Sequence, residues 1–269
     1  MSFSKFIRER QYLHNVSGNT VEWYRHAFKW LPSENPSTDE LKEAVMRMRA
    51  KGLKATGCNS AIRAINAYLK WSGSSGRIAQ LKEPQLILPT LSAVEIKKLV
   101  AWKPVGFYHR RLHLLVLFLL DTGCRITEAL TLRVSDVDMA NLLVTLDGKG
   151  RKQRVVPFSF ELRKALHRFV SEYRKPDRLL FASRNETQLG RRVMLRDVKL
   201  LCGRLGFTPP ARTLHAFRHT FAVNYLRRGG SVFHLQKVLG HSTLEMTRRY
   251  ANLMTEDLQA VHERVSLLS

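Results

Sequence analysis

Six side chains in the second half of this chain are of the types needed to break a phosphodiester bond without a metal ion. A tyrosine can supply the nucleophile, two guanidinium groups can hold the non-bridging oxygens, two imidazoles can exchange protons, and a lysine can protonate the leaving oxygen. The six residues are Arg125, Lys149, His215, Arg218, His241 and Tyr250. Together they predict phosphoryl transfer.

The short segments around these residues make the pattern specific. Arg125 follows a Thr-Gly-Cys segment, and Arg218 lies in a His-Ala-Phe-Arg-His segment. Tyr250 stands nine positions after the histidine of a Leu-Gly-His turn. In this order and spacing, the segments closely resemble those of the tyrosine recombinase (phage integrase) family. The resemblance covers residues 91–250 by motif, and the preceding part only by its size, helicity and charge.

Four of the six residues match family positions that hold the scissile phosphate. The resemblance implies that Arg125 and Arg218 grip the phosphate, and that Glu128, one helical turn after Arg125, holds that arginine in place. His215 would act there as proton acceptor or hydrogen-bond donor, at a helix N-terminus that favours an anion. His241 would hydrogen-bond the phosphate near the nucleophile. Taken singly, these arginines are more often surface residues, and the histidines are more often caps or turn residues.

The remaining two residues would act on the bridging oxygens. The resemblance matches Lys149, in a Gly-Lys-Gly turn, to the general acid and Tyr250 to the nucleophile. A phenol with a pKa near 10 is a poor nucleophile at neutral pH. We expect nearby cations, with Arg248 and Arg249 adding to the field, to favour the phenolate. A tyrosine at the end of a helix is otherwise most often a core residue; His219 is expected to support the core.

Composition independently predicts a polyanionic partner. The chain has 45 Lys and Arg against 22 Asp and Glu, a formal net charge of +23 and a pI near 10.6. Residues 1–85 contribute +7 of that charge and residues 86–269 contribute +16, so both parts are expected to be attracted to nucleic acid. A ribosomal protein would share this charge. The candidates for DNA contacts outside the six positions are Arg151, Lys152, Arg154, Arg248 and Arg249.

The cysteines, the apolar stretches and the N-terminal sequence predict which cofactors and which cellular compartment to expect. The three cysteines, Cys58, Cys124 and Cys202, are odd in number and lack metal-ligand spacing, so neither a disulfide framework nor a zinc site is expected. No metal or other cofactor is predicted. The longest apolar stretch, 112–120, is much shorter than the roughly 20 residues of a spanning helix, so no membrane partner is expected. Without a signal-peptide pattern, a cytoplasmic, nucleoid-associated protein is predicted.

Two domains are needed to position these groups. Turn residues cluster at 73–89, which predicts an N-terminal helical DNA-binding (core-binding) domain over 1–85 and a catalytic domain over 86–269 with a tail helix at 251–269. Capping boxes at Ser37 and Ser92 mark helix starts. Apolar spacing predicts further helices at 21–31, 58–69, 112–120, 162–173, 193–205, 215–226, 232–239 and 244–250. Strands are predicted at 142–146 and 154–157, joined by a basic hairpin turn.

The expected fold class is therefore mainly α with a small antiparallel β-sheet, an α+β fold. By resemblance, the two domains form a C-shaped clamp on double-stranded DNA, and strand exchange proceeds through a 3′-phosphotyrosine and a Holliday junction in a homotetramer, with a dimer at each site. A second recombinase or an accessory directionality factor is a further expected partner. A type IB topoisomerase with the same chemistry, and a catalytically silent DNA-binding regulator, are the alternatives.

Overall fold

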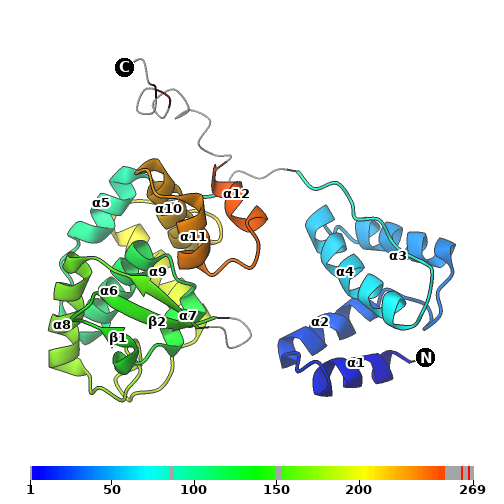
Figure 1. Cartoon of the computed structure of the whole chain (residues 1–269), viewed down its shortest axis with the longest axis horizontal. Coiled ribbons are helices and arrows are strands. Elements are labelled where there is room, and N and C mark those ends of the chain that lie inside the picture. Colours follow the sequence, from blue (N-terminus) through cyan, green and yellow to red (C-terminus); the bar gives the residue numbers. More distant parts are fainter. Residues whose placement is uncertain (1, 85–87, 149–152, 252–261, 263–265, 267–269) are drawn as a thin grey trace. The chain divides into compact units, whose positions relative to one another are not determined.

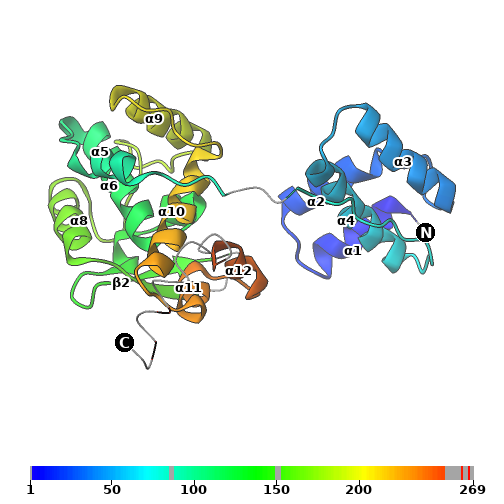
Figure 2. The same cartoon turned by 90° about the horizontal axis from the view of Figure 1, so that it is seen from above.

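The chain forms two compact units, Met1–Leu86 and Ile87–Ser269. The computed structural model describes residues 2–84, 88–148, 153–251, 262 and 266. Figures 1 and 2 show the helices of the first unit in blue to cyan and the elements of the second unit in green to orange. Each unit encloses a hydrophobic core of its own, so each is described by itself.

The N-terminal unit is a bundle of helices around an aromatic core. Serine side chains cap the first three of these helices, and Ser37 forms the predicted capping box with Glu40. The aromatic rings of Phe6, Tyr24 and Tyr68 meet in edge-on contacts with centroids 4.9 to 5.6 Å apart. The helices are α1 (Phe3–Tyr12), α2 (Gly18–Phe28), α3 (Thr38–Ala50) and α4 (Ala55–Trp71).

The second unit is mostly helical, with one small sheet. Its described helices are α5 (Ala93–Ala101), α6 (Gly106–Thr122), α7 (Ile126–Thr131), the short 3-10 helix η1 (Val134–Asp136), α8 (Phe160–Tyr173), α9 (Arg191–Arg204), α10 (Thr213–Arg227), α11 (Val232–Leu239) and α12 (Glu245–Ala251). The strands are β1 (Val137–Asp138), β2 (Leu143–Asp147) and β3 (Gln153–Pro157), antiparallel in the order β1-β2-β3. The mainly helical fold with a small antiparallel sheet is confirmed.

Helix α6 organises the core of the second unit. Its residues Leu115, Val116, Phe118 and Leu119 are fully buried, as expected for a helix that is apolar on most of its sides. Helices α8 and α10 pack against it, and Figure 2 shows α10 running beside it. Since α6 ends at Thr122, three positions before Arg125, this buried helix fixes the start of the predicted site.

The sheet holds the predicted hairpin and adds a strand that the sequence did not predict. Val144 on β2 pairs with Val156 on β3, and both are fully buried, so one face of the hairpin is fixed to the core. The two-residue strand β1 is too short to give a periodic signal. The predicted general acid Lys149 and its neighbours Arg151 and Lys152 lie outside the described residues, as does nearly all of the predicted tail helix at 251–269.

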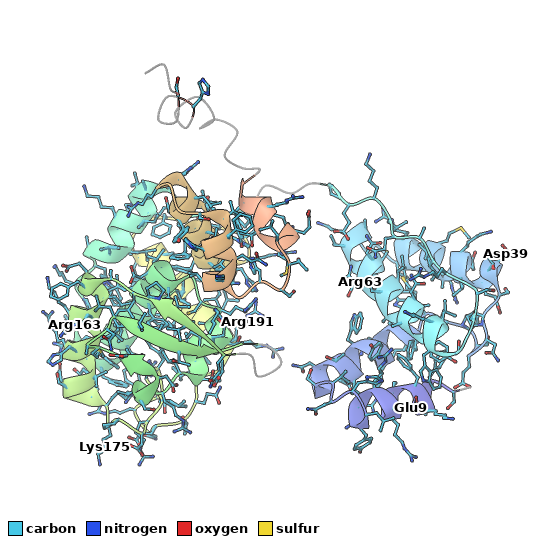
Figure 3. All side chains as sticks on the ribbon, in the orientation of Figure 1. Glu9, Asp39, Arg63, Arg163, Lys175 and Arg191 are labelled. Atoms are coloured by element: carbon cyan, nitrogen blue, oxygen red, sulfur yellow. The ribbon has the colours of Figure 1, made fainter. Side chains whose placement is uncertain are left out.

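Charged side chains project from both units. Figure 3 shows Arg63 on the N-terminal unit and Lys175 on the second unit pointing away from their ribbons, and both are exposed. Among the helices that the structure describes, none is both long enough and apolar enough to cross a membrane.

Candidate active site

A sharp corner between α6 and α7 presents Arg125. The hydroxyl of Thr122 donates to the carbonyl of Phe118 and accepts from the amide of Cys124, which closes the end of α6. Gly123 takes a left-handed backbone with a φ of +60°, and a β-carbon there would collide with the ring of Phe221 on α10. Glycine is therefore required at this corner by both backbone conformation and packing.

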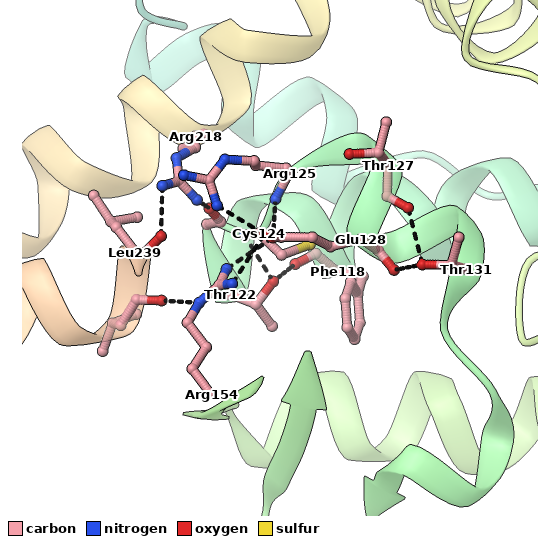
Figure 4. A network of polar contacts seen from close by, with 12 residues as sticks. Phe118, Thr122, Cys124, Arg125, Thr127, Glu128, Thr131, Arg154, Arg218 and Leu239 are labelled. Atoms are coloured by element: carbon pink, nitrogen blue, oxygen red, sulfur yellow. Dashed lines mark hydrogen bonds and ion pairs between the residues drawn. The ribbon is translucent and has the colours of Figure 1, made fainter. Parts of the chain in front are cut away.

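A buried carboxylate lies behind Arg125 (Figure 4). Glu128, whose side chain is 4% exposed, accepts hydrogen bonds from the Arg125 amide at 2.7 Å and from Arg125 Nη1 at 2.8 Å. Arg154 on β3 donates Nη1 and Nη2 to the same carboxylate at 2.9 and 2.8 Å. Burial raises the pKa of Glu128, but these hydrogen bonds outweigh it and hold the pKa below its usual value. The carboxylate therefore stays ionised and orients both arginines.

Arg154 joins three segments of the site. Besides its two bonds to Glu128, its Nε donates to the carbonyl of Val238 at 2.8 Å, at the end of α11. Its side chain is only 11% exposed, and its Cδ lies where a β-carbon on Gly240 would meet it at 2.9 Å. The prediction that Arg154 contacts DNA is therefore corrected, because its guanidinium is bound inside the unit. It ties β3 to the helix that carries Arg125 and to the turn before His241.

Arg218 reaches the same place from α10. The residue is 5% exposed and donates Nη1 to the carbonyl of Gly123 at 2.9 Å and Nη2 to the carbonyl of Leu239 at 2.6 Å. Both acceptors are neutral, so these bonds orient the guanidinium without cancelling its charge. Burial, and then the neighbouring charge of Arg125, lower the pKa of Arg218 to about 10, which leaves it protonated at neutral pH. Figure 4 shows the two guanidinium groups side by side.

Tyr250 lies on α12 against the apolar faces of α10 and α11. It is 4% exposed and belongs to a cluster with Ala222, Leu235 and Leu239. Its hydroxyl lies 3.0 Å from Nδ1 of His219. Burial raises the pKa of Tyr250, and the positive charges of Arg218 and Arg249 offset this only in part. The cations do favour the phenolate, as expected, but in the free protein burial is the larger effect and the pKa of Tyr250 stays above its ordinary value.

Two histidines, His219 and His241, contact the ring of this tyrosine, and burial lowers the pKa of both. His241 stacks parallel to the Tyr250 ring at 6.2 Å, and its Nδ1 lies 2.9 Å from the hydroxyl of Thr247. Burial, followed by the nearby arginines, lowers the pKa of His241 to about 4. Burial, and then the charges of His215 and Arg218, lower the pKa of His219 to about 4 as well.

His215 completes the group from the first turn of α10. Its ring faces that of His219 at 6.4 Å, since the two residues are four positions apart on one helix. Burial, and then the charge of Arg191 at the start of α9, lower the pKa of His215. The imidazoles are neutral and the guanidinium groups are positive, so the site has an excess of positive charge that favours binding of an anion.

The structure thus brings together five of the six predicted residues, with Lys149 outside the described part of the chain. Arg248 and Arg249 remain exposed on α12, and Arg248 lies 3.9 Å from Glu245. The contact between His219 and the Tyr250 hydroxyl was missed, since His219 was expected to support the core. Its spacing of four from His215 on one helix was the signal that could have indicated a place in the site.

Comparison with known proteins identifies the family of the chain. Residues 89–257 match the model of the phage integrase family. The chain belongs to the phage integrase family. It is a tyrosine recombinase, a DNA strand transferase of site-specific recombination. The chain is 28% identical over 265 residues to tyrosine recombinase XerA of Pyrococcus furiosus, covering 95% of this chain and 91% of that protein. It is 30% identical to XerA of Thermococcus kodakarensis, covering 82% of this chain and 79% of that protein.

Solved structures share the fold of this tyrosine recombinase. The Tn1549 transposon integrase in complex with transposon right end DNA superposes with a TM-score of 0.78 at 21% identity, covering 98% of each chain. The XerH recombinase bound to its difH substrate superposes with a TM-score of 0.71 at 20% identity, covering 99% of this chain and 84% of that chain. These likenesses show that both units have the recombinase fold.

The hydrogen bonds and ion pairs of Glu128 should make a measurable contribution to the free energy of unfolding. Replacing Arg154 with Met should lower the free energy of unfolding at pH 7 by about 3 kcal/mol, because one partner of a buried ion pair is removed. Because the pKa of Glu128 is lowered in the folded state, its stabilising effect is full above the unfolded value of about 4.3 and is lost as the pH falls through the lowered pKa. The deficit should therefore shrink in acid, as measured by urea unfolding across pH.

The exposed Arg192 on α9 provides the control. Arg192→Met should change the free energy of unfolding by less than about 0.5 kcal/mol. If Arg154→Met destabilises no more than Arg192→Met, the Glu128 network does not hold the site together.

Proposed function

We propose that this recombinase binds double-stranded DNA at recombination sites and exchanges strands through a covalent bond between the 3′-phosphate and Tyr250. One observation carries the proposal: the Tyr250 hydroxyl is held 3.0 Å from His219 Nδ1, within the field of Arg218 and Arg125. A phosphodiester at that hydroxyl would meet fixed guanidinium groups, which stabilise the charge that develops in the transition state.

The proposed reaction has two transesterifications. The Tyr250 oxygen bonds to phosphorus, the bond from phosphorus to the 5′-oxygen breaks, and that oxygen leaves as a hydroxyl after gaining a proton. The 5′-hydroxyl of a partner strand then attacks the phosphotyrosine and gives its proton back to the group that protonated the leaving oxygen. The tyrosine oxygen regains a proton and leaves as the phenol. The energy of the broken bond is kept in the phosphotyrosine, so we propose no nucleotide cofactor. Arg125 and Arg218 would grip the non-bridging oxygens, and His215 and His241 would hydrogen-bond them.

Charge supports DNA as the partner of both units. The net charge of +23 is shared by both parts of the chain, which favours binding to a phosphate backbone. The exposed Arg248 and Arg249, next to the nucleophile, would contact the backbone near the cut. We propose that the N-terminal unit is the core-binding domain and that the two units clamp the duplex. The structural neighbours described above, solved with DNA, support this arrangement.

The chemistry also supports a tetramer on DNA. Exchanging both strands of two duplexes breaks four phosphodiester bonds, and each Tyr250 can hold one 3′-end. Four protomers, two on each site, therefore complete one reaction through a Holliday junction. The apolar stripe of the tail, Leu258, Val261, Val265 and Leu268, lies outside the described residues; we propose that it contacts a neighbouring protomer.

Replacing Tyr250 with Phe should abolish covalent attachment to DNA while leaving DNA affinity nearly unchanged, because only the hydroxyl is lost. To measure this, the full chain is incubated with fragments of its own source DNA, and covalent protein–DNA adducts that resist denaturation are isolated. Sequencing the captured ends then identifies the recombination site.

Tyr108, which is 58% exposed on α6, is the matched control, and Tyr108→Phe should form the adduct as the parent does. Adduct formation by the Tyr250→Phe variant would show that another tyrosine is the nucleophile. No adduct from the parent chain on any fragment would contradict the proposed function itself.

Lys149 is proposed as the general acid for the leaving 5′-oxygen. Lys149→Ala should cleave the ordinary site about 100-fold more slowly, since an alkoxide must leave without a proton. A site with sulfur in place of the bridging 5′-oxygen releases a thiolate, which leaves readily without a proton. Lys149→Ala should therefore cleave this site nearly as fast as the parent does. Arg218→Ala, which loses a phosphate clamp, should stay slow on both substrates. If Lys149→Ala is also slow on the sulfur substrate, Lys149 positions the phosphate, and Lys152 becomes the candidate acid.

A further inference from the structure

His219 has a contact that the roles assigned so far leave unexplained. Its Nδ1 lies 3.0 Å from the Tyr250 hydroxyl, although the two residues are 31 positions apart in the chain. Its ring packs at 47° to the tyrosine ring, with the centroids 5.7 Å apart, so the contact is edge to edge at the polar atoms. The atom that His219 touches is the atom that must attack phosphorus.

That oxygen needs a partner to take its proton. Tyr250 is 4% exposed, so bulk water has little access to the phenol, and burial keeps the phenol protonated. General base catalysis removes such a proton while the new bond forms, and it requires a proton acceptor within hydrogen-bond reach. A neutral imidazole whose proton is on Nε2 leaves Nδ1 free to accept from the phenol.

We propose that His219 is a catalytic residue, the general base that takes the proton of Tyr250 during attack on the scissile phosphate. The inference rests on the proposed function, and it names the group that activates its nucleophile. As the bond from the tyrosine oxygen to phosphorus forms, the phenol O–H bond breaks and an N–H bond forms at Nδ1 of His219. The proton returns to the phenol when a 5′-hydroxyl attacks the phosphotyrosine.

The other two imidazoles are less well placed to accept this proton. His241 lies parallel to the tyrosine ring with the planes 6° apart, so it covers a face of the ring, and its Nδ1 is paired with Thr247. His215 faces the far side of His219, with ring centroids 6.4 Å apart. Arg218 also hydrogen-bonds the Tyr250 hydroxyl, but a guanidinium can only donate, so among the three imidazoles only His219 is within hydrogen-bond distance of the hydroxyl as a proton acceptor.

The surrounding charges make this base dependent on substrate. The groups facing His219 are His215 and Arg218 on α10, Arg212 directly before α10, Arg249 and Tyr250 on α12, and His241 in the turn between α11 and α12. Burial, and then the charges of His215 and the arginines, disfavour an imidazolium at His219, so the free protein holds the proton on the tyrosine. A bound phosphate diester brings a negative charge that offsets the arginines and makes protonation of His219 easier. The nucleophile is therefore activated only when DNA is in place.

The test compares tyrosine with a more acidic phenol at position 250, which needs less help from a base to lose its proton. The full chain, with Tyr250 or with a fluorinated tyrosine at position 250, is combined with a nicked duplex that carries the site found by covalent capture. Single-turnover adduct formation is measured. His219→Ala and His219→Asn should each slow the adduct about 100-fold with unchanged DNA affinity. Fluorination makes the phenol more acidic, so it should recover at least about tenfold of that loss.

His215→Ala serves as the matched control, because it removes an imidazole from the same face of α10 without touching the phenol. Its defect should not be recovered by fluorotyrosine. The inference is overturned if His219→Ala stays within about threefold of the parent, if fluorination recovers neither His219 variant, or if it recovers His215→Ala to the same extent. Folding of each variant is judged by its DNA affinity. Failure of the parent itself to form an adduct would contradict the proposed function instead.

Discussion

The buried carboxylate of Glu128, shared by Arg125 and Arg154, is the interaction on which the site depends. A charge that is 4% exposed must be paired, and each of its partners comes from a different element. Arg125 is thereby aimed outward at the end of α6, and Arg154 fixes β3 against α7 and the end of α11. The segments that carry Arg125, His241 and the base of the β2–β3 hairpin are held in one arrangement before any DNA is bound.

The site around Glu128 holds more positive charge than this carboxylate neutralises. Arg218 bonds to two carbonyl groups, three histidines are kept neutral, and Tyr250 keeps its proton. Each of these states follows from burial beside guanidinium groups without a matching anion. The free protein is therefore preorganised for an anion and keeps the phenol of Tyr250, its proposed nucleophile, protonated.

Sequence patterns predicted the local parts of this structure well and its long-range contacts poorly. Helical periodicity and the capping boxes at Ser37 and Ser92 depend on residues three or four apart, and the structure contains both boxes. Arg154 appeared to be one more basic residue of a hairpin because its partner, Glu128, is 26 positions away. The burial of Tyr250 and its bond to His219 also depend on how α10 and α12 pack, which no spacing within either helix records.

We expect the charge of a bound phosphate to complete the site, and the titration of His241 on and off DNA measures this. The Tyr250→Phe variant can be titrated by NMR, free and bound to a duplex that carries the recombination site, with His241→Gln used to assign the resonance. In the free protein the pKa should be about 4, because of burial and the arginines. On DNA it should rise toward the ordinary value of about 6.5, since the phosphate offsets the arginines. A pKa that is the same in both states would show that a bound phosphate does not offset the arginines.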